Sequence, residues 1–367
     1  MASPLEFFPS KVLTLYLGRM FAVRIVAVLL MLVLILQMLD LLGESGKILA
    51  YKGNSEVQIW TYISLRAPQL VARFLPYSVL LATILSLATL NQNSEVIAMK
   101  AAGLSAHQVL APLFLTAVAI SAISFAFNER VVTRANATLK AWQAANYGPM
   151  PRDSAVRSNV FLRDGANVLM AATISGEGAQ TVMERVTWYR RDAAGMIVEQ
   201  IRSPRARFAA PGWRLEAPTA FDVRSAEAYQ LQTVVLAREI TPAQVAISNV
   251  DADGENIVRL WQSIRNMREA GRRTSELEGK WWHKLSGPLS ATLMPLLGAI
   301  AAFGLARSGQ LLIRAVIGMA LGFTYFVIDN AALAMGNFGG YPPLIAAWAP
   351  FLLFALVGET VLVRTEE

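Results

Sequence analysis

The chain has 367 residues, of which 54% are hydrophobic and only 16% are charged, and its mean hydropathy is +0.42. Soluble domains carry about 25% charged residues, so the composition excludes an ordinary soluble protein. The lack of cysteine excludes disulfides, iron–sulfur clusters and thiol catalysis. A net charge of +7 is explained without nucleic acid, because Lys and Arg fix membrane topology and lie near anionic headgroups.

Six segments are apolar enough, or nearly so, to cross a membrane as helices of about 20 residues. The first segment, 21–42, is longer than the apolar region of a cleaved signal peptide, which predicts a retained helix. The others are 74–91, 107–127, 284–304, 313–335 and 344–362. The amphipathic stretch 55–73 predicts an interfacial helix that leads into the second span, with Pro76 near the turn of entry.

Charges in the short loops predict the orientation of the spans. Lys and Arg gather on one side of the predicted membrane at Lys11, Arg19, Arg24, Lys100, Arg307, Arg314 and Arg364. The positive-inside rule then places both termini in the cytoplasm and the long insert outside. Lys47 and Lys52 lie on the outer side and weaken this assignment slightly.

The insert between the third and fourth spans changes period. Short runs rich in β-branched and aromatic residues, separated by Gly and Pro, occur at 159–171, 181–190, 196–201, 213–221 and 229–240. They predict an antiparallel sandwich or roll. Segment 256–270 returns to a helical period, and 128–147 is expected to extend the third span as a helix.

Catalytic motifs are scarce in this sequence. The only two histidines, His107 and His283, fall on opposite sides of the predicted membrane, which argues against a two-histidine metal site. The sequence contains neither a G-x-x-x-x-G-K-[ST] phosphate loop nor a G-x-S-x-G elbow. If ATP drives this protein, a partner must therefore hydrolyse it.

The loop between the second and third spans reads N-S-E-V-I-A-M-K-A-A-G from Asn93 to Gly103. Asn93 or Ser94 is a suitable N-cap and Gly103 a suitable C-terminal stop, which predicts a short helix. This helix offers Glu95 and Lys100 at the cytoplasmic surface. It is either a solvated connector or a coupling helix that docks into an ATPase.

Two carboxylates fall within or near the ends of spans. An ionisable group in a span is costly to desolvate, so it is a candidate for function. Asp329 lies in a long apolar block, which favours a side chain facing a cavity. For Asp40, near the outer end of the first span, a cavity-facing role and an interfacial role are equally compatible with the sequence.

Two further residue pairs have informative spacing. Arg66 and Arg73 are seven residues apart and therefore on one helix face, where they either contact an anionic headgroup or anchor the helix. Gly318 and Gly322 form a G-x-x-x-G pair, which predicts a close helix–helix seam or gate in the fifth span.

With these residues identified, the chain resembles the lipopolysaccharide-export permeases, the paired F- and G-type subunits of an ABC transporter. The resemblance covers nearly the whole length. It rests on the three-plus-three layout and on an ordered set of motifs: Tyr16–Arg19, Ser94–Gly103, Lys284–Pro288 and Phe326–Asn330. The last motif, together with Gln37–Asp40, is more similar to the G-type subunit.

The resemblance implies a fold class: an α-helical membrane protein with six transmembrane helices and an inserted antiparallel β-jellyroll. The implied domains are 1–127, with a coupling helix at about 93–103, then a periplasmic jellyroll with flanking helices at 128–283, and 284–367. The implied location is a bacterial inner membrane.

The resemblance also implies a function and partners. Two related permease subunits enclose a cavity open to the outer leaflet, and a dimeric cytoplasmic ATPase, which uses ATP and magnesium, binds their coupling helices through Glu95. The chain itself would bind no cofactor and no nucleic acid. Lipopolysaccharide, or a similar glycolipid, would pass from the cavity to a single-span β-jellyroll bridge protein.

One departure from the family concerns the outer half of the first span. Members of the family carry lysines there that bind lipid phosphates, whereas Gln37–Glu44 contains none. The cargo then carries fewer phosphates, or other cations at the cavity rim replace the lysines: Arg66, Arg73, Lys47 and Lys140. Gln37, Asp40 and Asp329 are the remaining candidates for the cavity.

Three other functions remain in competition. A permease for another lipid or for lipoproteins is the alternative within transport, although lipoprotein-release permeases place their large domain after the first span. A membrane-embedded transferase would need clustered acids or histidines near one membrane face. A non-transporting anchored scaffold would not need six spans.

Overall fold

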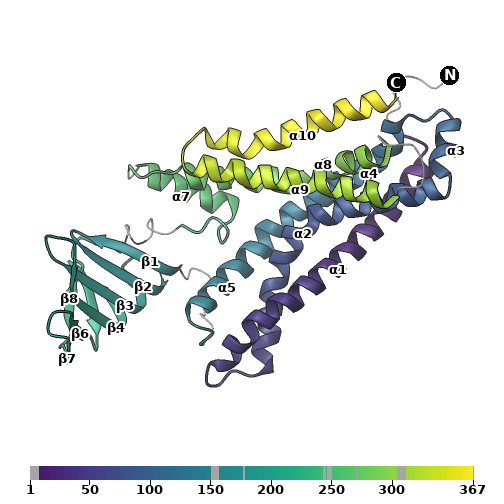
Figure 1. Cartoon of the computed structure of the whole chain (residues 1–367). Coiled ribbons are helices and arrows are strands. Elements are labelled where there is room, and N and C mark those ends of the chain that lie inside the picture. Colours follow the sequence, from purple (N-terminus) through teal and green to yellow (C-terminus); the bar gives the residue numbers. More distant parts are fainter. Residues whose placement is uncertain are drawn as a thin grey trace. The chain divides into compact units, whose positions relative to one another are not determined.

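The computed structural model describes residues 8–149, 157–176, 178–242, 245, 250–269, 271–303 and 311–366 (Figure 1). The chain divides into two compact units. The helical unit comprises 1–40, 67–130 and 272–367, and the β unit comprises 41–66 and 131–271. The predicted link that contains Arg307 lies outside the described residues.

Helices make up the helical unit and also contribute to the β unit. They are α1 (Lys11–Ala50), α2 (Glu56–Gln92), α3 (Glu95–Ala101), α4 (Ala106–Phe127), the π-helix η1 (Asn128–Val132), α5 (Thr133–Ala144), α7 (Ile257–Glu269), α8 (Ser275–Phe303), α9 (Leu311–Asn337) and α10 (Pro343–Glu366). Among the described residues, five helices are long and apolar enough to cross a membrane: α1, α2, α4 with its extension, α9 and α10. The remaining predicted span lies in α8, whose first turns, Ser275–Lys284, are polar.

The predicted turn near Pro76, at the entry to the second span, does not occur. Helix α2 runs without interruption from Glu56 to Gln92 and contains both Pro68 and Pro76. Each proline removes one backbone hydrogen bond, but buried Leu70, Leu75 and Val79 hold the helix on both sides of Pro76. Tertiary packing thus overrides the local preference for a break.

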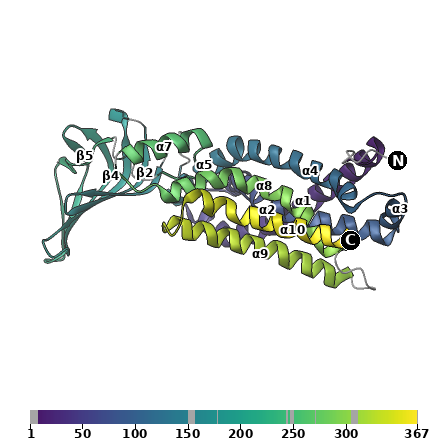
Figure 2. The ribbon, with the colours of Figure 1, turned by 90° about the horizontal axis from the view of Figure 1, so that it is seen from above.

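A single hydrophobic core joins the helices of the helical unit. Helices α8, α9 and α10 lie side by side in both views (Figures 1 and 2), and α4 packs against α8. The core draws buried side chains from seven helices, including Phe21, Leu87, Leu113, Met294, Tyr325 and Phe354.

Glycines set the closest approaches between these helices. A Cβ atom built on Gly298 of α8 would lie 2.7 Å from Cγ2 and 2.9 Å from Cβ of Thr83 on α2. Gly322 of α9 likewise lies directly against Leu80 of α2. Small residues allow this proximity, which matters in a membrane because lipid provides no hydrophobic drive for helix association.

Gly298→Ala is expected to destabilise the helical unit by about 1–3 kcal/mol, because the added methyl group meets the rigid Cβ of Thr83. Gly46→Ala in α1 is the matched control, since its Cβ would have no atom within 4 Å. That change should stabilise the protein slightly, because alanine is the better helix former. Thermal unfolding in detergent measures both; equal melting temperatures would contradict the proposed seam.

The insert is an antiparallel sheet, as predicted. Its strands are β1 (Arg157–Asp164), β2 (Asn167–Ser175), β3 (Val182–Arg191), β4 (Ile197–Ala209), β5 (Gly212–Glu216), β6 (Thr219–Asp222), β7 (Glu227–Gln230) and β8 (Val234–Leu236). The order is β1-β2-β3-β4-β5-β8, and β6 pairs with both β4 and β7. Alternate side chains form one apolar core, which includes Leu169, Val186, Trp188, Trp213 and Leu215.

Strand β4 changes partner along its length. Residues 199–202 pair with β6, whereas 205–209 pair with β5. Pro204 lies between these two stretches, where no backbone N–H is required for either ladder. The hydroxyl of neighbouring Ser203 lies 2.6 Å from the carbonyl oxygen of Glu216 and 2.7 Å from that of Arg205. The sequence thus places its proline and serine where the sheet branches.

A polar cluster joins β3, β4 and β7. Glu199 is buried, and its carboxylate contacts Arg190 at 3.2 Å and accepts a hydrogen bond from the Tyr229 hydroxyl at 2.5 Å. This hydrogen bond to a carboxylate raises the pKa of the Tyr229 phenol.

A second, smaller core in the β unit joins α5 to the hairpin formed by the end of α1 and the start of α2. Ile48, Tyr62, Leu139, Trp142 and Tyr147 pack together. The Asn54 amide donates to the carbonyl oxygens of Ile48 and Tyr147, both at 2.8 Å. The end of α1 and the start of α2 therefore belong to the same unit as the sheet.

Candidate functional site

The short helix α3 lies between α2 and α4, at the position predicted from Asn93–Gly103. Val96 and Met99 are buried and attach it to the helical core. The helix stops shortly before Gly103, which has φ +88°. The Leu104 N–H donates a hydrogen bond to the Met99 carbonyl oxygen, which closes this end of the helix. Ser94 differs from the expectation, because it adopts a left-handed conformation and its side chain makes no capping bond.

Glu95 of α3 is bound to the first span. Its Oε2 accepts a hydrogen bond from the Tyr16 hydroxyl of α1 at 3.4 Å, and its Oε1 accepts one from the Asn93 amide at 3.2 Å. Tyr16 belongs to the Y-L-G-R motif, and Glu95 to the S-E-V-I-A-M-K-A-A-G motif. The structure therefore brings together two motifs that are 79 residues apart in the sequence.

The outward surface of α3 carries both an apolar and a charged side chain. Ile97 is 65% exposed, and Lys100 is exposed as well. Val96 and Met99 of the same helix are buried instead. An exposed isoleucine next to a cation on a short, well-anchored helix is suited to docking in a partner's groove.

The predicted cavity residues of α1 differ in their surroundings. Gln37 is only 8% exposed, and among the described residues neither its amide nitrogen nor its oxygen has a hydrogen-bond partner. Such an unpaired buried amide costs about 1–3 kcal/mol. Asp40 is half-buried near the boundary between the two units.

The four candidate rim cations are not equivalent. Arg66 is half-buried and Arg73 is exposed, and both lie on the continuous helix α2. Lys47 is 66% exposed and pairs with Glu44 at 2.8 Å.

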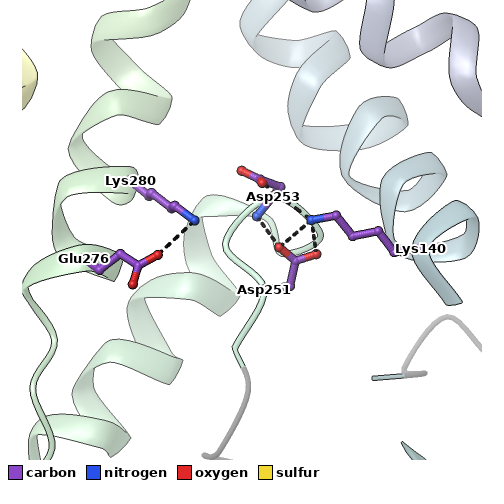
Figure 3. Close-up of polar contacts among 5 residues, drawn as sticks. All are labelled: Lys140, Asp251, Asp253, Glu276 and Lys280. Carbon is purple, nitrogen blue, oxygen red and sulfur yellow. Dashed lines mark hydrogen bonds and ion pairs between the residues drawn. The ribbon is translucent and has the colours of Figure 1, made fainter. Parts of the chain in front are cut away.

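Lys140 of α5 is held by two carboxylates (Figure 3). Its Nζ lies 2.8 Å and 2.7 Å from the two oxygens of Asp251 and 3.5 Å from Asp253. Its positive charge is therefore already balanced within the β unit. Figure 3 also shows the exposed pair Glu276–Lys280 of α8, at 3.2 Å.

Asp329 of α9 is 5% exposed, and its Oδ2 lies 3.0 Å from Nε2 of His283 on α8. The carboxylate that the sequence assigns to a cavity thus has a partner on the neighbouring helix. Gly318 and Gly322 lie on the same helix, and Gly322 packs against α2.

The next residue of α8, Lys284, contacts a different element. Its Nζ lies 3.6 Å from Oε1 of Glu129 in η1, and the two side chains are 9% and 13% exposed. A π-helical turn, of the kind that often occurs at functional sites, carries Glu129. Sequence reasoning missed this buried ion pair; the polar pair His283–Lys284 directly before an apolar block was the signal for it.

Among the residues that the structure describes, no group of three or more His, Asp or Glu side chains is arranged to hold a metal ion. The candidate residues instead form two sets in the helical unit. One set comprises Tyr16 and Glu95 at α3, and the other comprises the pairs made by His283 and Lys284 of α8.

Comparison with known proteins gives a consistent result. The family described as "Lipopolysaccharide export system permease LptF/LptG" matches residues 15–364. The lipopolysaccharide export system permease protein LptG of Escherichia coli K12 is 25% identical over 375 residues, which cover 97% of this chain and 99% of that protein. LptG of Haemophilus influenzae is 22% identical over 312 residues, covering 83% of this chain and 86% of that protein.

Proposed function

Because the chain belongs to the LptF/LptG family of lipopolysaccharide export permeases, we propose that it extracts lipopolysaccharide, or a related glycolipid, from the outer leaflet of the inner membrane. It is a multi-pass inner-membrane protein and a permease subunit of lipopolysaccharide export. Permeases of this family transport rather than catalyse, so the chain is a transport subunit and not an enzyme.

The hydrogen bond between Tyr16 and Glu95 is the main structural support for coupling between an ATPase and the first span. A force applied to α3 from the cytoplasm reaches the first span directly, because the α3 carboxylate is hydrogen-bonded to α1. Helix α1 then continues without a break to Ala50, beyond Gln37 and Asp40. One rigid helix thus links the proposed ATPase contact with the proposed cargo cavity.

The same proposal specifies the partners. A dimeric cytoplasmic ATPase, which uses ATP and magnesium, binds α3, and a related F-type permease completes the cavity. The cargo passes through the β unit to a single-span bridge protein. This chain binds no cofactor and no nucleic acid, its termini are cytoplasmic and its β unit is periplasmic. The unpaired buried amide of Gln37 supports a further binding partner at α1.

The test of this proposal is copurification. The ATPase should remain attached to the wild-type permease in mild detergent and dissociate when the exposed surface of α3 is changed, for example by Ile97→Asp. Ile97 is 65% exposed, so the substitution leaves the core intact. If the ATPase is retained equally by the variant, α3 is a solvated connector and not a coupling helix.

For cargo binding, the double change Arg66→Ala/Arg73→Ala should weaken loading of an anionic lipid by roughly tenfold or more, since each desolvated, hydrogen-bonded arginine contributes about 1.5–3 kcal/mol. A single alanine change should cost less, because the remaining arginine shifts towards the headgroup. Photocrosslinking of radiolabelled lipopolysaccharide to the purified complex measures the loading.

The conservative variant separates recognition from anchoring. Arg66→Lys/Arg73→Lys keeps both charges but loses bidentate contacts to phosphate. Anchoring residues would tolerate this change, whereas phosphate contacts would weaken. Loading at the wild-type level in the double alanine variant would show that headgroup recognition lies elsewhere.

A further inference from the structure

A groove of about 700 Å³ lies in the helical unit between the start of α1 and the first half of α4. It is separate from the proposed cargo site, since Arg19 and Gln37 are 18 residues apart on a continuous helix, or about 27 Å along its axis. The residues that define it are Lys11, Leu15, Arg19, Pro112, Leu115 and Thr116.

The walls of the groove are apolar and its floor is a close helix contact. Leu15 is 73% exposed and Leu115 is 48% exposed, so both offer bare hydrocarbon surface along the groove. At the floor, a Cβ built on Gly18 would lie 3.1 Å from Oγ1 of Thr116, which leaves no room for a larger residue between the helices. The groove thus offers a continuous surface to an elongated apolar group.

Two cations line the same groove. Lys11 and Arg19 are both exposed, and among the described residues neither side chain makes a hydrogen bond or an ion pair. They lie eight residues apart on α1, about 12 Å along the axis. Lys11 is also the first residue of α1, where the helix dipole favours an anion.

The groove crosses from charged to apolar surroundings. Arg19 lies two residues before the apolar block that begins at Phe21, whereas Pro112 and Leu115 lie inside the candidate span of α4. Because the apolar side chain of Leu15 lies between the two cations along α1, an occupant must carry both negative charge and hydrocarbon. A soluble anion lacks the second property and an acidic protein segment lacks a reason to enter the span.

We propose that this groove binds an anionic glycerophospholipid, with its phosphate at Lys11 and Arg19 and an acyl chain against Leu15 and Leu115. The proposal does not rest on the cargo or the partner ATPase. The bound lipid fills the gap between α1 and α4 beside the Gly18–Thr116 contact, on the same stretch of α1 that holds Glu95 through Tyr16.

The experiment uses the full chain with its copurifying subunits in nanodiscs of phosphatidylcholine that contain a minor fraction of phosphatidylglycerol. Native mass spectrometry then counts the lipids retained after release. Lys11→Ala/Arg19→Ala should reduce retained phosphatidylglycerol roughly thirtyfold, equivalent to about 2 kcal/mol, since two basic residues near an anionic headgroup are removed. The control, Lys52→Ala/Arg364→Ala, removes the same charge outside the groove and should retain the wild-type amount.

A second variant guards against misfolding. Leu15→Glu places a carboxylate at an exposed wall position, so the core stays intact while the phosphate is repelled. It too should lose phosphatidylglycerol. Equal retention by wild type and both groove variants would overturn the proposal, as would equal retention of phosphatidylcholine and phosphatidylglycerol. A photocrosslinker at Leu15 that reacts with a protein subunit instead of lipid would also overturn it.

Discussion

Replacing Lys284 by Met is expected to lower the free energy of unfolding by about 3–5 kcal/mol, because it leaves the Glu129 carboxylate buried without its counter-charge. The two side chains are 9% and 13% exposed, and their charged atoms are 3.6 Å apart. Unfolding of the purified protein by denaturant gives the magnitude.

Two further variants test whether the loss of stability comes from the buried Glu129–Lys284 ion pair itself. The double change Glu129→Leu/Lys284→Met removes both buried charges and should recover most of the loss, since apolar replacement of a buried pair is often neutral. Lys280→Met breaks the exposed Glu276–Lys280 pair of the same helix, at 3.2 Å, and should cost only about 0.3–0.5 kcal/mol. Similar losses in Lys280→Met and Lys284→Met would show that burial of the Glu129–Lys284 pair is unimportant.

Glu95→Lys is expected to weaken the coupling of ATP hydrolysis to lipid release. The substitution replaces a carboxylate that accepts hydrogen bonds from Tyr16 and Asn93 by an ammonium group that accepts none. It also repels any basic residue that the ATPase presents to α3. We expect lipid release per ATP hydrolysed to fall by roughly tenfold or more, equivalent to about 1.4 kcal/mol of lost coupling.

Milder variants distinguish the two roles of Glu95. Glu95→Gln keeps an acceptor for Tyr16 but removes the charge, so it tests the ion pair with the ATPase. Tyr16→Phe keeps the charge but removes the link to α1, so it should preserve ATPase binding and reduce lipid release. If Glu95→Lys leaves both copurification and lipid-stimulated ATPase activity unchanged, Glu95 has no part in coupling.

The sequence predicts the short helix at Asn93–Gly103 well, because turn and stop residues act locally. It offers Asn93 or Ser94 as the cap, whereas Ser94 adopts φ 59° and its side chain makes no capping bond. It also predicts a break at Pro76 that does not occur. In both cases tertiary contacts of α2 and α3 decide the outcome, and local propensity is too weak to oppose them.

The polar contacts within the helical unit were beyond sequence reasoning. Asp329 was identified as a functional candidate, but its contact with His283 depends on the register between α8 and α9. The same holds for Lys284 with Glu129 and for Tyr16 with Glu95. Periodicity shows which face of a helix is apolar, but not which residue of a neighbouring helix lies opposite.

In the β unit, too, the sequence predicts the strands but not how they pair. The runs of β-branched and aromatic residues predict most strands, including β3 at Val182–Arg191. The exchange of partners by β4 was not predicted, although Pro204 lies where it occurs. A proline within a strand indicates an edge or an interruption, but it does not say which strand follows.

In the proposed mechanism, this permease passes a lipid to its β unit in an ATP-dependent step. The most direct measurement places a photocrosslinker at Phe208, which packs against the core of the sheet, or at neighbouring Arg207, which is exposed. Successive residues of a strand face opposite sides of the sheet, so Arg207 is a matched control. In proteoliposomes that contain the ATPase and the F-type subunit, ATP should raise lipopolysaccharide crosslinking at Phe208 and not at Arg207. Crosslinking that ignores ATP, or that is equal at the two positions, would contradict the account.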